Sequence, residues 1–208
     1  MSEYYIPTDP GEAEFTEKRS RFLGHVRMVE SEDEARAFIA DMKKKYYDAR
    51  HNCWCYSIKD GPERYSDDGE PQGSAGIPML EVLRRQNVTN AVCVVTRYFG
   101  GVLLGTGGLL RAYTKSTADA LEAAGISAVR RWVETELPCT YAQLERMKQE
   151  AASAGGIVED VEYGAGVTLR VMVPEEQSED FAARIFDRTA GSVTVRVTGE
   201  SFRAVPLR

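Results

Sequence analysis

The sequence has no long apolar run. No stretch of about 18 apolar residues is present, which excludes a helix long enough to span a bilayer. Residues 1–15 are polar and acidic, and they lack the apolar centre of a signal peptide. The sequence therefore predicts a cytoplasmic protein that does not associate with a membrane.

The sequence is also poor in metal ligands. It has two histidines and four cysteines. Three of the cysteines (Cys53, Cys55 and Cys93) lie in apolar, strand-like runs, which favours reduced, buried thiols over disulfides. A closed zinc site needs four suitably spaced ligands, and a single C-x-C with two histidines does not supply them. The sequence predicts no metal site and no cofactor.

Positive charge is not in excess either. The net charge of −6 argues against a basic coat for nucleic acid, and no sequence-specific DNA binding is expected. The charge is uneven, because residues 1–131 carry −1 and residues 132–208 carry −5. A local basic patch is compatible with the first part, whereas the second part is a poor match for a polyanion.

The hydrophobic pattern predicts two α+β domains, residues 1–132 and 133–208. In the first, Ser31 and Glu34 form a capping box at the start of a helix. A further helix carries Ile77, Leu80 and Leu83, and Gly125 ends another. The elements expected here are strands at 13–15, 21–29, 51–58 and 91–96, and a last helix at about 109–124.

The second domain has a different order of elements. A strand at 129–138 precedes a helix that is expected to begin at Thr140, with Gln143 completing a second capping box. A hairpin turns at residues 164–166, between strands at 157–163 and 167–173. A helix at about 178–190 and a strand at 192–202 complete the order β-α-β-β-α-β, which is typical of a ferredoxin-like domain.

The first candidate site is the acidic segment 66–73. Its three carboxylates, Asp67, Asp68 and Glu70, could bind a hard cation or act as acid and base. The spacing of an EF-hand and its closing glutamate are missing. The alternative, favoured on composition, is a turn whose Asp and Ser side chains cap the next helix. His51 is a weaker catalytic candidate, for which a structural role is favoured.

The second candidate site is the glycine-rich segment that follows the strand at 91–96. Glycines let the backbone approach a ligand, and the next helix offers free N–H groups to a phosphate or carboxylate. Arg97 and Arg111 flank the segment as partners for an anion. The alternative is that the glycines allow close packing and the arginines pair with the acidic segment. The glycines are Gly100, Gly101, Gly105, Gly107 and Gly108.

Four stretches in order resemble the IMPACT/YigZ family: EKRSRF (17–22), ARHNC (49–53), SDDGEPQGSAGIPML (66–80) and the glycine-rich 96–113. The resemblance implies a ribosomal-protein-like N-terminal domain similar to domain IV of elongation factor G. It also implies a C-terminal domain similar to domain V of that factor. Many family members have a lysine where this chain has Leu103, so one cation is missing from the segment.

The resemblance also implies a role in translation. Eukaryotic relatives restrain the starvation-responsive kinase of translation initiation by competing for its ribosome-associated activator. Their recognition domain is not found in this sequence, so that partner is not carried over. Bacterial relatives have no settled biochemical activity.

Together these features favour a non-catalytic protein whose N-terminal cleft contacts the ribosome, RNA or a translation factor. Phosphates would then bind the glycine-rich segment with Arg64, Arg97, Arg111 and Lys115. The alternative is an enzyme, a hydrolase or transferase, acting on a small anionic or peptide substrate at the acidic segment. No pair of nucleophile and base is visible for it. In a third interpretation the acidic segment and the arginines simply pair with each other.

Overall fold

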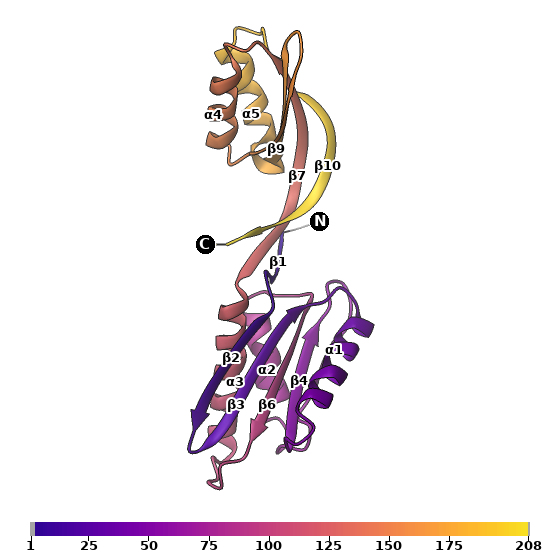
Figure 1. Cartoon of the computed structure of the whole chain (residues 1–208), viewed down its shortest axis with the longest axis vertical. Coiled ribbons are helices and arrows are strands. Elements are labelled where there is room, and N and C mark those ends of the chain that lie inside the picture. Colours follow the sequence, from indigo (N-terminus) through magenta and orange to yellow (C-terminus); the bar gives the residue numbers. More distant parts are fainter. Residues whose placement is uncertain (1–2, 208) are drawn as a thin grey trace. The chain divides into compact units, whose positions relative to one another are not determined.

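The computed structural model describes residues 3–207, which form two units (Figure 1). One comprises residues 4–129 with 204–207, and the other comprises residues 130–203 with Glu3. The two-domain α+β architecture predicted from the sequence is confirmed. Strand β7 (Ile126–Cys139) runs through the boundary without a break, and the finer limits 1–132 and 133–208 stay a prediction.

The N-terminal unit is built on a five-stranded antiparallel sheet in the order β2-β3-β6-β4-β5. A further short strand, β1 (Tyr4–Pro7), pairs with the beginning of β7. Neither β1 nor β5 was expected from the sequence pattern. The bounds of the five sheet strands are β2 Gly11–Glu17, β3 Ser20–Met28, β4 His51–Ser57, β5 Glu63–Ser66 and β6 Ala91–Tyr98.

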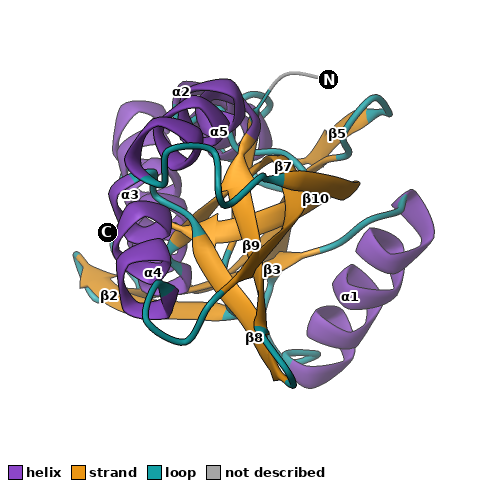
Figure 2. Cartoon of the chain, turned by 90° about the horizontal axis from the view of Figure 1, so that it is seen from above, coloured by secondary structure: helices purple, strands orange, loops and turns teal. Residues whose placement is uncertain are grey.

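Side chains of this sheet alternate between two buried layers. Cys93 and Val95 of β6 face α2 (Gly76–Arg85) and α3 (Thr106–Ala124). Val92 and Val94 face α1 (Glu32–Lys45) on the other side. Figures 1 and 2 show α1 on one face of the sheet and α2 with α3 on the other. All four cysteines of the chain are free and buried, as the sequence predicts.

Helix starts differ in how well the sequence predicts them. The backbone N–H of Glu34 donates to Ser31 Oγ at 3.2 Å, which confirms Ser31 as the N-cap of α1. The reciprocal bond of the capping box is displaced by one residue, because Glu34 Oε2 accepts from the backbone N–H of Glu30 at 2.8 Å. The expected start of α3 at residue 109 is wrong, because the helix begins at Thr106. Leu109 N already donates to the carbonyl of Gly105, so Gly107 and Gly108 lie in the first helical turn rather than in a loop.

The C-terminal unit has the predicted order β7-α4-β8-β9-α5-β10. In its sheet β10 pairs with β7, and β9 lies between β7 and β8. The predicted hairpin is confirmed, with Gly164 N bonded to the carbonyl of Gly166. The bounds are α4 Leu144–Ser153, β8 Ile157–Tyr163, β9 Val167–Pro174, α5 Glu175–Arg188 and β10 Arg196–Pro206.

Three expected boundaries in this unit are wrong. Helix α4 begins at Leu144 instead of Thr140, because residues 141–143 form a turn in which Gln143 N donates to the carbonyl of Thr140 at 3.0 Å. The Gln143 side chain does accept from Thr140 N at 2.9 Å, as the second capping box predicts. Helix α5 begins directly after Pro174, earlier than expected. Strand β10 begins later than expected, because Thr189 Oγ1 bonds to backbone groups of residues 185 and 193 and extends the turn after α5. No helix among residues 3–207 is long and apolar enough to cross a membrane.

The close contact between the sheet and α3 yields a first prediction. A Cβ at Gly24 of β3 would lie 2.5 Å from the carbonyl oxygen of Ser116, so Gly24→Ala forces the helix away from the sheet. We expect the free energy of unfolding to fall by about 1–3 kcal/mol in urea titrations followed by circular dichroism.

Gly107→Ala is the matched control for this substitution. Its Cβ would meet only Arg111 Nη1, at 3.6 Å, and alanine favours a helix over glycine. This variant should be as stable as the wild type or more stable. Equal stability of the Gly24→Ala variant and the wild type would contradict the packing described here.

Candidate functional site

The carboxylate of Asp67 caps the segment that leads into α2. Its Oδ1 accepts hydrogen bonds from the backbone N–H groups of Ala75 at 3.0 Å and Gly76 at 2.8 Å. Its Oδ2 accepts one from Gly73 at 2.8 Å. These N–H groups lie at the helix start, where a negative charge is stabilising. The capping interpretation of the acidic segment therefore describes Asp67.

Asp68 ties the acidic segment to β4 and to the end of α1. Its carboxylate accepts hydrogen bonds from Lys43 Nζ at 2.6 Å and from the backbone N–H of Asn52 at 2.7 Å. His51 Nδ1 lies 2.9 Å from the carbonyl oxygen of Asp68. The imidazole of His51 thus holds the backbone of this segment, which is a structural role.

Glu70 and Arg97 form a buried ion pair. Their side chains are 3% and 6% exposed, and Arg97 Nη1 donates to Glu70 Oε1 at 2.7 Å. The Tyr113 hydroxyl donates to the same oxygen at 2.8 Å, and burial raises the pKa of Tyr113, which keeps its proton. Arg97 Nη2 donates to Ser20 Oγ at 3.3 Å. The pair thus joins the acidic segment, β6, α3 and the start of β3.

Two aromatic rings enclose the guanidinium of Arg97. It lies 5.6 Å from the ring centroid of Phe22 and 5.5 Å from that of Phe99. Its Nε is buried and has no hydrogen-bond partner among the described atoms. The charge of an arginine held in this way is already paired with Glu70, so Arg97 is a poor partner for a phosphate. The expectation that the arginines pair with the acidic segment is met by Arg97.

The buried thiol of Cys53 has no base that could activate it. Burial raises the pKa of Cys53, whose Sγ donates to the carbonyl oxygen of Asp67 at 2.9 Å. A thiol of this kind is a poor nucleophile, because the thiolate is the reactive species. Among residues 3–207, no group of three or more His, Cys, Asp and Glu side chains is placed to hold a metal ion. This arrangement gives the enzyme alternative no support.

The glycine-rich segment lies against the turn between β2 and β3. A Cβ at Gly100 would lie 2.0 Å from the backbone of Arg19, so only glycine fits there. Gly101 and Gly105 have φ of +82° and +72°, in the region that favours glycine. Gly105 directly precedes α3, whose first N–H groups have no partner within the helix.

A pocket of about 370 Å³ opens between this segment and the buried ion pair. Gly105 and Thr106 line one side of it, and His51, Glu70 and Arg97 line the other. Arg50 also lines the pocket, is exposed and has no acidic partner within the described part of the chain. Sequence reasoning missed Arg50, although the stretch ARHNC contains it.

The structure separates the remaining cations that the sequence grouped together. Arg111 and Lys115 line a different pocket of about 220 Å³, together with Lys18 of the β2–β3 turn. Lys115 pairs with Asp119 at 2.6 Å, whereas Arg111 is exposed and has no acidic partner in residues 3–207. Leu104 borders both pockets, so the two lie side by side.

Arg64 lies elsewhere in the unit. It pairs with Tyr56 across β4 and β5, and Tyr56 belongs to the layer that faces α1. The segment that holds Arg97 packs toward α3 on the opposite face. The structure therefore does not bring Arg64 together with the glycine-rich segment.

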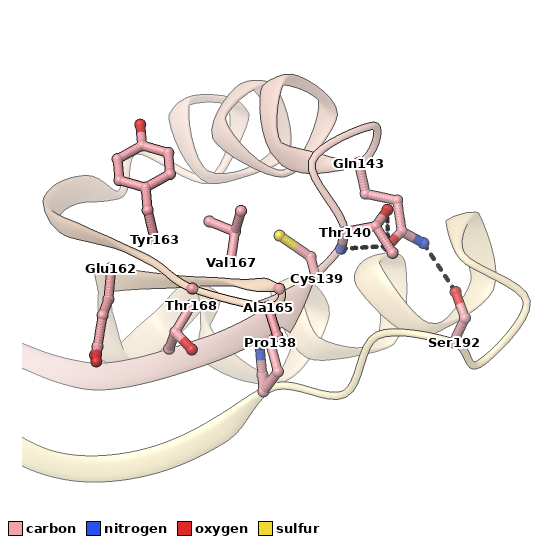
Figure 3. Close-up of a pocket in the computed structure, with 12 residues that line it drawn as sticks. Pro138, Cys139, Thr140, Gln143, Glu162, Tyr163, Ala165, Val167, Thr168 and Ser192 are labelled. Carbon is pink, nitrogen blue, oxygen red and sulfur yellow. Dashed lines mark hydrogen bonds between the residues drawn. The ribbon is translucent and has the colours of Figure 1, made fainter.

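A further pocket, of about 470 Å³, lies in the C-terminal unit beside the β8–β9 hairpin (Figure 3). Gln143 Nε2 donates to Ser192 Oγ at its edge, at 3.0 Å. Glu162 is its one charged lining residue, and no cation lines it. This pocket is larger than the one at the glycine-rich segment, but none of its described lining residues is a cation that would attract an anion.

Fold and site together define a two-domain α+β protein in which a glycine-rich helix start lies above a buried ion pair. Residues 18–121 match the Impact N-terminal domain, and residues 137–192 match a domain of unknown function, DUF1949. The chain belongs to the IMPACT family.

Similar proteins cover nearly the whole chain. IMPACT family member YvyE of Bacillus subtilis is 34% identical over 94% of this chain and 91% of that protein. IMPACT family member YigZ of Escherichia coli is 34% identical over 93% of this chain and 97% of that protein. A crystal structure of a hypothetical protein has a TM-score of 0.60 and 33% identity, and the match covers 96% of this chain and 98% of that chain.

The buried ion pair yields a second prediction. Arg97→Met leaves the Glu70 carboxylate buried without its partner, so the free energy of unfolding should fall by about 3–5 kcal/mol. The double variant Glu70→Gln/Arg97→Met removes both charges and should recover most of that loss. Urea unfolding of the two variants measures the difference. An exposed ion pair contributes less than about 1 kcal/mol to stability. A decrease in the free energy of unfolding of this size in the Arg97→Met variant would therefore contradict the burial of the pair.

Proposed function

We propose that this protein is a translation-linked binding protein that contacts ribosomal RNA through the surface around the start of α3. The observation that carries the proposal is a pair of exposed arginines beside this helix start, Arg50 and Arg111, which have no acidic partner among residues 3–207. Arg50 lines one of the two adjoining pockets and Arg111 the other. We call these two residues with the first turn of α3 the helix-start surface.

The helix-start surface suits a phosphate. A Cβ at Gly107 would lie 3.6 Å from Arg111 Nη1, so this guanidinium lies beside the first turn of α3. The free N–H groups of that turn and the positive end of the helix dipole favour an anion. An arginine can add two parallel hydrogen bonds to phosphate oxygens. Lys18 in the neighbouring pocket adds a further cation.

Exposed apolar side chains beside these cations favour RNA over a small anion. Phe99 is 46% exposed and Leu103 is 82% exposed. RNA recognition commonly combines phosphate contacts with unstacked bases that lie on aromatic rings. The ring of Phe99, which lies 5.5 Å from the guanidinium of Arg97, offers such a face.

The link to translation rests on the resemblance to elongation factor domains. This is a likeness of fold, and it is the reason for choosing ribosomes as the binding partner to test. Protein IMPACT of Rattus norvegicus matches 45% of this chain, and the chain covers 31% of that protein. The activity of the eukaryotic protein is therefore not transferred. The alternative substrate site at Asp67, Asp68 and Glu70 is not proposed, because protein groups already engage all three carboxylates.

Co-sedimentation with purified ribosomes across a salt series tests the proposal. Arg97 is unsuitable as a target because it supports the fold. Arg50→Ala/Arg111→Ala removes two exposed cations and should weaken binding at least about tenfold. It should also reduce the slope of log affinity against log salt by about 1.5 to 2, because two phosphate contacts are lost.

The matched control is Arg85→Ala/Arg146→Ala, which removes the same charge. Both of its arginines are exposed and have no ion pair within the described residues. The control should sediment as the wild type does. An equal loss of ribosome binding in both double variants would mean that only the net charge matters, which would contradict a specific surface. A wild type that stays in the supernatant at low salt would refute the proposal.

A further inference from the structure

Another pocket of the N-terminal unit, of about 440 Å³, lies on the opposite face of its sheet, between α1 and strands β4 and β5. Ile39 and Ala40 of α1 form one wall, and Trp54 and Tyr56 of β4 form the other. Its volume is within the range of small-molecule sites, about 300 to 1,000 Å³. We call it the α1-face pocket. It shares no residue with the helix-start surface.

The wall formed by β4 is aromatic. The rings of Trp54 and Tyr56 are nearly parallel, at 7°, with centroids 5.7 Å apart. Tyr56 is 1% exposed, whereas Trp54 is partly exposed and lines the pocket. Two nearly parallel rings beside each other on one strand offer an aromatic surface for another planar group.

The polar groups of this pocket leave one positive charge unpaired. Glu32 accepts hydrogen bonds from Arg36 and from the Tyr56 hydroxyl, both at 2.7 Å. Lys43 pairs with Asp68. Arg64, by contrast, donates to the backbone carbonyl of Glu63 and forms no salt bridge within residues 3–207, although its charge also acts on Glu32 across the pocket.

The acidic neighbour of Arg64 along β5 is already engaged. Glu63 pairs with Arg84 at 2.6 Å, so it does not neutralise the guanidinium of Arg64. Arg64 lies opposite Tyr56 in the pairing of β4 with β5, so it is next to the aromatic wall. Arg64 is exposed. A ligand in the pocket can therefore meet a flat apolar face and an unpaired cation together.

We propose that the α1-face pocket binds a nucleotide, with its base stacked on Trp54 and its phosphate held by Arg64. A planar aromatic group joined to an anion satisfies both features of the site, whereas an apolar peptide would bury the Arg64 charge without a partner. Base stacking on aromatic rings and arginine–phosphate contacts are the usual means of binding nucleotides without sequence preference. The nucleotide is either free or part of an RNA strand.

Intrinsic fluorescence tests this proposal directly. The chain has two tryptophans, and Trp132 in the C-terminal unit is only 3% exposed. Adenosine 5′-monophosphate should therefore quench the emission of Trp54 in a saturable manner. Trp54→Phe keeps an aromatic ring but removes the reporter, so its remaining emission, from Trp132, should not respond. Absence of saturable quenching in the wild type would overturn the proposal.

Two matched variants locate the phosphate. Arg64→Gln should raise the dissociation constant about tenfold, by loss of a charge-assisted contact, in both fluorescence and calorimetric titrations. Arg85→Gln removes the same charge on α2 and should bind as the wild type does. Equal affinities of the Arg64→Gln and Arg85→Gln variants would contradict the assignment.

The source of the nucleotide is decided by a comparison of probes. Tighter binding of an oligoadenylate RNA than of the mononucleotide indicates an RNA strand, and equal binding indicates a free nucleotide. Adenosine without phosphate should bind more weakly than either, and equal affinity would remove Arg64 from the site. The Arg64→Gln variant should bind ribosomes as the wild type does, because the α1-face pocket shares no residue with the helix-start surface.

Discussion

The N-terminal unit depends on one buried ion pair, between Glu70 and Arg97. Two charges removed from water are stabilising only when their geometry is good and their other polar groups are satisfied. Here Tyr113 and Ser20 supply additional hydrogen bonds and two aromatic rings lie beside the guanidinium, while Arg97 Nε alone has no partner among the described atoms. Four segments distant in the sequence must therefore be in place together, and the glycine-rich segment takes its position from them.

Much of this fold could be predicted from the sequence, because it depends on local signals. The N-cap of α1 at Ser31, the hairpin at 164–166 and the βαββαβ order follow from turn chemistry and periodicity over a few residues. The short strands β1 and β5 could not, because pairing with distant strands defines them. The start of α3 was missed for a related reason. Glycines are poor helix formers, so tertiary packing and not local propensity places Gly107 and Gly108 in the helix.

The candidate site was harder to predict, because its chemistry depends on which residues face each other. Sequence spacing allowed Asp67, Asp68 or Glu70 to pair with Arg97 or Arg111, and only the fold selects Glu70 with Arg97. It also placed Arg64 with the other arginines, although the register with Tyr56 turns Arg64 to the α1 face. An arginine in a recognisable motif can thus serve the architecture, while less prominent residues such as Arg50 remain available to a ligand.

The N-terminal unit also includes residues 204–207, and Leu207 N bonds to the carbonyl of Ile126. Contacts between such distant positions form slowly, since a long loop must close first. During synthesis the N-terminal residues of this unit leave the ribosome long before residues 204–207 do. The glycine-rich segment lacks Tyr113 until α3 has been made, and the unit lacks the backbone pairing of Leu207 with Ile126 until Leu207 has been made. A nascent chain therefore completes this unit only after residues 130–203 of the other unit have been made, so the N-terminal unit acquires its full stability late.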